Sequence, residues 1–107
     1  MASTNTTNVR TALLVRLDAK PGKEEAVASF LKDGLSIVQD EPATITWYAL
    51  KLGPSTYGIF DTFPDDAGRD AHLAGRVAAA LMASASELLL TPPMIDKVEI
   101  LAAKIPS

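Results

Sequence analysis

The sequence predicts an α+β domain whose elements follow the order β-α-β-β-α-β. Two segments place apolar residues at intervals of three and four positions, which is the spacing of one buried helix face. Four shorter segments have the alternating or continuous apolar pattern of strands, and a short turn containing Gly-Pro joins two of them. The length of 107 residues suits a single domain.

The first half of the chain is predicted to contain a strand, a helix and the start of a hairpin. Residues 11–17 form a strand that is apolar on both sides, which indicates that both of its faces are covered. A turn at residues 18–22 leads into a helix over residues 23–39, and residues 40–43 end it. The buried stripe of this helix is predicted to comprise Ala26, Val27, Phe30, Leu31, Leu35 and Val38.

The second half is predicted to complete the hairpin and to add a helix and a strand. Residues 44–52 and 57–63 form the two antiparallel strands, because only a short turn separates them. Asp65 or Asp66 caps a helix that extends to about residue 90 and that Gly75 bends or interrupts. Residues 91–93, Thr-Pro-Pro, end this helix, and residues 97–105 form the last strand.

Small residues dominate one side of the second helix. The stripe expected to pack against the sheet comprises Ala67, Ala71, Ala74, Ala78, Leu81, Ala85 and Leu88. His72 lies about 140° from this stripe on a continuous helix, so we expect it to face solvent, a loop or the mouth of a pocket.

This element order is that of ferredoxin-like folds, in which helices cover one face of a four-stranded antiparallel sheet. The other face then carries apolar and aromatic residues without a partner inside the chain. Because an exposed patch of that kind usually marks an interface, we expect a homodimer that packs through the sheet face.

Composition excludes several classes of function. Without cysteine there are no disulfides, Cys-based zinc sites or thiol nucleophiles, and one histidine cannot build a His-rich metal site. The net charge of −3 and the scattered basic residues argue against nucleic acid as a partner. No apolar run is long enough to span a membrane. Residues 1–10 are expected to form a flexible polar tail rather than a signal peptide, residues 11–107 the single domain, and the cytoplasm is the expected location.

Several short motifs together resemble the antibiotic biosynthesis monooxygenase family of dimeric α/β barrels. They are residues 20–25 (Lys-Pro-Gly-Lys-Glu-Glu), residues 41–44 (Glu-Pro-Ala-Thr) and residues 71–73 (Ala-His-Leu), in this order along residues 11–105. The resemblance implies a dimer with a small-molecule pocket between sheet and helices. It also implies oxidation of a small aromatic, phenolic or quinol-like substrate by O2, with no cofactor and no metal.

The same resemblance points to candidate site residues. His72 is the implied base, with a pKa suited to neutral pH, and Asp61 orients it or accepts a substrate hydroxyl. Asp61 stands where the family commonly carries Glu. The candidate substrate-binding residues are Trp47, Tyr48, Tyr57, Phe63, Arg69 and Arg76. The chain lacks the Asn, the helical Trp and the His ligand of the heme-degrading branch, so heme degradation is not expected.

Simpler interpretations of these residues stay open. Asp61 could form a structural ion pair with Arg16, Arg69 or Arg76. The arginines at 69 and 76 could be solvated surface residues, and Trp47 and Tyr48 point to opposite faces, so only one of them can line a given pocket. A non-catalytic small-molecule-binding dimer is one alternative function, and an isomerase or cyclase on the same fold is another.

Overall fold

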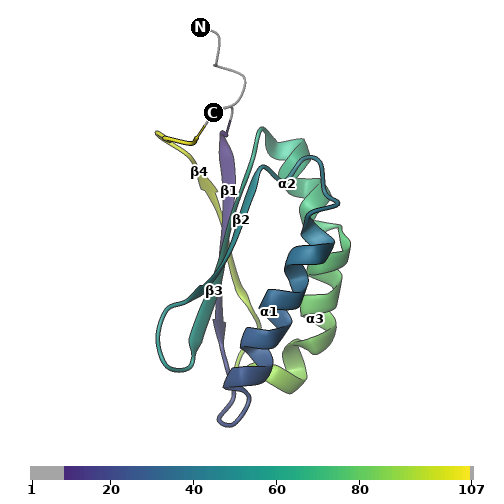
Figure 1. Cartoon of the computed structure of the whole chain (residues 1–107), viewed down its shortest axis with the longest axis vertical. Coiled ribbons are helices and arrows are strands. Elements are labelled where there is room, and N and C mark those ends of the chain that lie inside the picture. The colour runs from purple at the N-terminus through teal and green to yellow at the C-terminus, as the bar shows by residue number, and fades with distance from the viewer. Residues whose placement is uncertain (1–8, 107) are drawn as a thin grey trace, which may run out of the picture.

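The computed structural model describes residues 9–106, so most of the predicted tail at residues 1–10 lies outside the described residues. Within them the elements are β1 (Thr11–Asp18), α1 (Glu24–Val38), β2 (Thr46–Lys51), β3 (Thr56–Phe63), α2 (Asp66–Leu73), α3 (Arg76–Leu88) and β4 (Met94–Glu99). The strands form one antiparallel sheet, and the helices cover the same side of it (Figure 1). The predicted α+β fold is therefore confirmed.

The sheet has the strand order β2-β3-β1-β4, so β3 and β1 lie at its centre. β2 and β3 pair as the predicted antiparallel hairpin, with Trp47 opposite Asp61 and Tyr48 opposite Phe60. On the other side of β3, Leu13 of β1 also lies opposite Asp61. Because side chains alternate along a strand, Leu13, Trp47 and Asp61 share the helix-facing side of the sheet.

The last strand lies earlier in the chain than predicted, since β4 ends at Glu99 instead of continuing to residue 105. Its pairing with β1 explains both limits. Met94 lies opposite Arg16, and Glu99 lies opposite Thr11, where β1 begins. Only one more backbone hydrogen bond follows, from the N–H of Ile100. The prediction of a strand over residues 97–105 was wrong because its partner strand ends at that point.

The core lies between the sheet and the helices. Leu13, Leu17 and Phe63 are the most deeply buried large side chains of the strands. Burying a side chain of this size contributes about 1.5–3 kcal/mol to folding. The buried stripe of α1 is narrower than predicted, because Ala26 and Leu35 are exposed. Its members are Val27, Leu31, Gly34 and Val38.

The predicted second helix is divided into α2 and α3 by a break at Ala74 and Gly75, as the glycine suggested. The predicted stripe of small residues is correct only in its second part: Leu81 is buried and Ala85 and Leu88 pack against the core, whereas Ala67, Ala71 and Ala74 are exposed. In α2 the buried residues are Gly68 and His72, and in α3 they are Val77 and Leu81. Ala67 and Ala71 are exposed, so α2 packs inward through the side that carries Gly68 and His72, not through the side that the alanines predicted.

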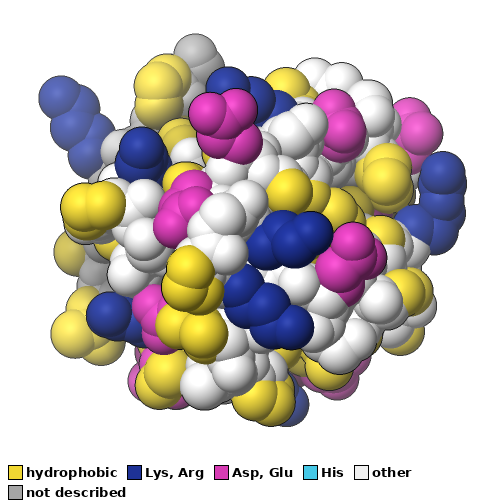
Figure 2. Space-filling model, turned by 90° about the horizontal axis from the view of Figure 1, so that it is seen from below, with side chains coloured by type: hydrophobic (Ala, Val, Ile, Leu, Met, Phe, Trp, Pro, Cys, Tyr) yellow, Lys and Arg dark blue, Asp and Glu magenta, His cyan; other side chains and the backbone are white. Residues whose placement is uncertain are grey.

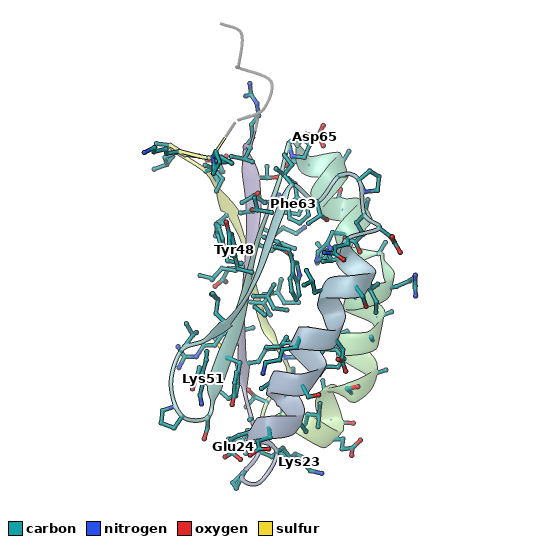
Figure 3. The ribbon with its side chains drawn as sticks, viewed as in Figure 1. Lys23, Glu24, Tyr48, Lys51, Phe63 and Asp65 are labelled. Atoms are coloured by element: carbon teal, nitrogen blue, oxygen red, sulfur yellow. The ribbon has the colours of Figure 1, made fainter. Side chains whose placement is uncertain are left out.

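The side of the sheet away from the helices carries hydrophobic residues that no helix covers. We call these residues the open face, and they are Leu14, Tyr48, Leu50, Phe60 and Met94. Tyr48 is 53% exposed and lies on this side in Figure 3. The lower end of the molecule, shown in Figure 2, has no uniformly hydrophobic surface, because Lys, Arg, Asp and Glu side chains are interspersed with the hydrophobic ones there.

Among the described residues, no helix is both long and apolar enough to cross a membrane.

Candidate active site

Glu41 lies in the turn that follows α1. Backbone hydrogen bonds close this turn, from the N–H of Glu41 to the carbonyl of Val38 and from the N–H of Thr44 to the carbonyl of Glu41. The hydroxyl of Thr44 donates to Oε1 of Glu41 at 2.8 Å, which orients the carboxylate. The sequence motif did not mark Glu41 as a site residue. The Glu-x-x-Thr spacing, which lets the hydroxyl reach the carboxylate, is the signal that could have identified it.

Asp61 lies near the C-terminal end of β3, on the helix-facing side of the sheet. Its side chain is 1% exposed, so it needs a charged partner. The partner is His72, whose Nε2 lies 2.9 Å from Oδ2 of Asp61, as expected if Asp61 orients the imidazole, and not one of the arginines of the alternative interpretation. The other carboxylate oxygen, Oδ1, has no hydrogen-bond partner within residues 9–106. The charge of this buried carboxylate is therefore balanced by His72 alone, at Oδ2, among the residues that the structure describes.

α2 places His72 above the sheet. The helix begins after Asp65, whose carboxylate accepts a hydrogen bond of 2.8 Å from the N–H of Gly68, the capping interaction that the sequence predicted. One turn later His72 projects from the same buried side as Gly68. Its ring lies 5.4 Å from the ring of Phe63, centroid to centroid. His72 is therefore buried and does not face solvent, but it does face a loop, the turn after α1, which was one of its expected positions.

His72 lies between two carboxylates. Its Nδ1 is 2.6 Å from Oε1 of Glu41, a short hydrogen bond, and its Nε2 makes the 2.9 Å ion-pair contact with Oδ2 of Asp61. Burial is the largest influence on the imidazole and lowers its pKa, but the hydrogen bonds and charges of Asp61 and Glu41 outweigh burial, so the pKa of His72 is raised. The imidazolium form can donate to both carboxylates at once, which neutral imidazole cannot.

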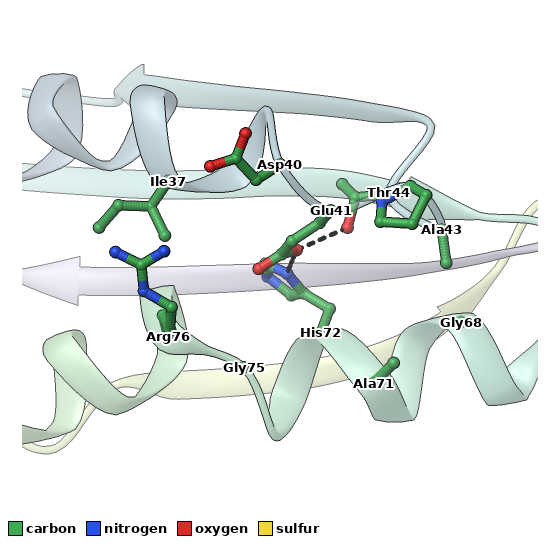
Figure 4. A pocket seen from close by; sticks show the side chains of 11 residues that line it. Ile37, Asp40, Glu41, Ala43, Thr44, Gly68, Ala71, His72, Gly75 and Arg76 are labelled. Carbon is green, nitrogen blue, oxygen red and sulfur yellow. Dashed lines mark hydrogen bonds and ion pairs between the residues drawn. The ribbon is translucent and has the colours of Figure 1, made fainter.

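A pocket of about 330 Å³ opens beside Glu41 and His72 (Figure 4). The turn after α1 lines one side, and α2 with the start of α3 lines the other. Glu41 is 20% exposed and His72 only 7%, and Asp61 is not part of the pocket wall. Glu41 is therefore the group of the three that a pocket ligand meets most directly. A carboxylate backed by an imidazolium and a second carboxylate can accept or return a proton.

The two candidate arginines have different environments. Arg69 is 12% exposed and donates to the carbonyls of Ala12 and Val98, each at 3.3 Å, and it pairs with Asp66. It thus ties α2 to β1 and β4, outside the pocket. Arg76, the first residue of α3, lines the pocket with Glu41 and His72.

The four candidate aromatic residues do not line the pocket beside His72. Phe63 is fully buried against His72, and Trp47 packs under α1, where its ring lies 3.6 Å from the position of a Cβ at Gly34. Tyr57 is buried and borders a separate hollow between α1 and β2. Tyr48 belongs to the open face. The pocket wall is instead aliphatic, with Ile37, Pro42, Ala43 and Ala71.

Glu41, Asp61 and His72 are residue types that can bind metal ions, but their arrangement does not suit a metal. Both ring nitrogens of His72 contact carboxylates, which leaves no lone pair directed at an ion. Across residues 9–106, no three acidic or histidine side chains converge as a metal site.

The antiparallel sheet with helices on one side has the fold of the antibiotic biosynthesis monooxygenases. The chain is similar to a candidate antibiotic biosynthesis monooxygenase from Nitrosomonas europaea, with 14% identity over 86% of this chain and 90% of that one and a TM-score of 0.77. Another, from Caulobacter crescentus, has 13% identity over 88% and 92% and a TM-score of 0.75. At such identity the likeness concerns the fold.

A second comparison is much closer in sequence. NE2512 from Nitrosomonas europaea, described as a protein of unknown function, is 57% identical over 92% of this chain and 96% of its own length, with a TM-score of 0.90. The chain belongs to the same family as NE2512. No protein-family model and no curated protein matches it.

Proposed function

We propose that the chain is a cofactor-independent monooxygenase that acts on a small aromatic, phenolic or quinol-like molecule bound in the pocket beside His72. The observation that carries this proposal is the position of His72 between Glu41 and Asp61, with Glu41 open to the pocket. The fold that the chain shares with candidate monooxygenases supports the same reaction class.

Proton removal is the step that these residues perform in the proposal. With His72 protonated, the cluster carries one net negative charge. Asp61 balances the imidazolium from the buried side, so the carboxylate of Glu41 accepts the proton of a substrate hydroxyl. The resulting substrate anion is electron-rich. Of the residues named at the outset, His72 and Asp61 keep catalytic and positioning roles in this scheme, and Glu41 joins them as the direct base.

The oxidation that follows draws its electrons from the substrate. A phenol with a free ring position reacts with O2 to give a quinone and water, so that one oxygen atom enters the product and the other leaves as water. Four electrons pass from the organic molecule to O2. The two protons in the water come from the hydroxyl and from the ring C–H that is replaced. The protein supplies the proton acceptor and the aliphatic, partly enclosed pocket.

The homodimer is also part of the proposal. The open face exposes Leu14 on β1, Tyr48 on β2 and Met94 on β4, and pairing two open faces would remove these side chains from water. Sedimentation at micromolar concentration should give twice the chain mass. Tyr48→Lys should shift the protein toward the monomer while its far-UV circular dichroism is kept. A wild-type protein that sediments as a monomer would contradict the dimer.

An isomerase that uses the same proton transfer is the second candidate, because the cluster provides an acid and a base without any group committed to O2. An oxygen electrode combined with product analysis separates the two. We expect the wild type to consume one O2 per quinone formed from a panel of phenols and hydroquinones. Glu41→Gln should lower turnover by about 10²–10⁴-fold, the usual contribution of a general base.

Thr44→Val is the matched variant, since it removes the hydroxyl that orients Glu41 but leaves the carboxylate. It should lower turnover less than Glu41→Gln does. Substrate conversion without oxygen uptake would favour the isomerase. Tight binding of the same compounds without conversion would favour the non-catalytic binding dimer.

A further inference from the structure

The pocket has a distinct chemical group at each part of its length. In Figure 4 Arg76 and Ile37 lie at one end, Ala43 and Ala71 lie toward the other, and the bonded pair of Glu41 and His72 lies between them. A ligand in this pocket therefore meets a cation, an ionisable pair and an aliphatic surface in sequence. The volume of about 330 Å³ suits a molecule of one or two rings.

The guanidinium of Arg76 is unused by the protein itself. Within residues 9–106 it makes no hydrogen bond and no ion pair, although Asp40 and Glu41 line the same pocket. Arg69, seven residues earlier, differs from Arg76, because its guanidinium donates to two backbone carbonyls and forms an ion pair with Asp66. Arg76 is therefore the cationic group of the pocket wall that is available to a ligand.

We propose that the substrate is a hydroxylated aromatic carboxylic acid, an inference that rests on the proposed function of this pocket. Its carboxylate pairs with Arg76, its hydroxyl donates to Glu41, and its ring lies on the aliphatic surface of Ala43 and Ala71. The planar guanidinium offers two parallel N–H groups, which match the two oxygens of a carboxylate. A neutral phenol would leave this group without a partner.

The charges around the pocket set the expected size of the effect. Asp40 and Glu41 repel an anion, whereas His72 in its protonated form and Arg76 attract it. Arg76 is exposed, so solvent and salt weaken its ion pair. We expect a carboxylate to bind about tenfold more tightly than its neutral amide, and the preference to shrink as the salt concentration rises.

Binding can be measured without turnover. Tag-free protein under nitrogen is titrated with 2-, 3- and 4-hydroxybenzoate and with the matching hydroxybenzamides, and the imidazole NMR signals are followed. His72 is the only histidine of the chain, so these signals report on the pocket alone. At least one hydroxybenzoate should bind about tenfold more tightly than its amide, and Arg76→Gln should abolish that preference.

Two variants serve as controls. Asp40→Asn removes an opposing charge from the same pocket and should strengthen benzoate binding. Lys32→Gln removes a cation that does not line this pocket and should change nothing. Equal affinity for acid and amide, a preference that survives Arg76→Gln, or no ligand-induced shift of His72 would each overturn the inference. Oxygen uptake decides the oxygenase proposal separately, so the two can fail independently.

Discussion

Replacing His72 with glutamine is expected to destabilise the fold chiefly through Asp61. Glutamine removes the positive charge but leaves the carboxylate of Asp61, which is 1% exposed, without an opposite charge. Breaking a buried ion pair by removing one partner costs about 3–5 kcal/mol. A domain of this kind has a free energy of unfolding of about 5–15 kcal/mol, so the variant should fold with a much reduced margin.

A second substitution tests that cause. Asp61→Asn, added to His72→Gln, removes the unpaired charge, so the double variant should regain about 2 kcal/mol although it carries one more substitution. Asp61→Asn alone should cost less than His72→Gln, because Glu41 still accepts a hydrogen bond from the histidine. The effects of the two substitutions are therefore strongly non-additive, as expected for side chains in contact.

Urea unfolding at pH 7 measures these differences. Trp47 is the only tryptophan and packs under α1, so its fluorescence reports loss of the core. With a slope of about 1–3 kcal/mol per molar urea, a loss of 3–5 kcal/mol moves the midpoint by about 2 M. Protein concentration is kept constant, since self-association would shift the midpoint. A double variant no more stable than His72→Gln would refute the reasoning, because Asp61 would then not be the source of the loss.

Three further predictions concern the surroundings of the site. The pKa of His72 should exceed that of a free histidine in an NMR titration. The contribution of protonated His72 to the free energy of unfolding is then complete below pH of about 6.5 and is lost as the pH rises through the folded pKa. A urea midpoint that does not fall over that pH range would show that the two carboxylates do not raise the pKa of His72. Gly68→Ala should cost about 1–3 kcal/mol in urea unfolding, since its Cβ would lie 3.3 Å from that of Ala43; Gly53→Ala, in open space, is the control and should be near neutral. Arg69→Met should cost about 1–3 kcal/mol, because two backbone carbonyls lose a charged donor, and an unchanged midpoint would show that these bonds contribute little.

The fold could be predicted because it depends on local patterns. The period of the apolar residues separates helices from strands, and the short link at residues 52–56 determines the hairpin. Asp65 and Gly75 mark a helix start and a helix break through backbone chemistry that acts within a few residues. The limits of β4 could not be predicted in this way, since they depend on where β1 begins in a pairing between distant segments.

The candidate site was only partly predictable for the same reason. His72 and Asp61 stood out by residue type, but the partner of Asp61 depends on how α2 crosses the sheet. Glu41 escaped notice because it lies in a turn 31 positions before His72 and meets it only in the folded chain. The angle of about 140° between Ala67 and His72 holds within α2, but the buried side of this helix is the one with Gly68 and His72, because Ala67 and Ala71 are exposed.

The close approach of α2 to the turn after α1 explains why small residues surround His72. A Cβ at Gly68 would lie 3.3 Å from the Cβ of Ala43, and a Cβ at Gly75 would lie 3.1 Å from Oε2 of Glu41. Larger side chains at either position would push the helix and the turn apart. The contact of 2.6 Å between Glu41 and His72 therefore depends on glycine before and after the histidine. Gly68 and Gly75 lay outside the stripe of small residues expected to pack on the sheet, and their role is to let the carboxylate and the imidazole approach each other at the pocket.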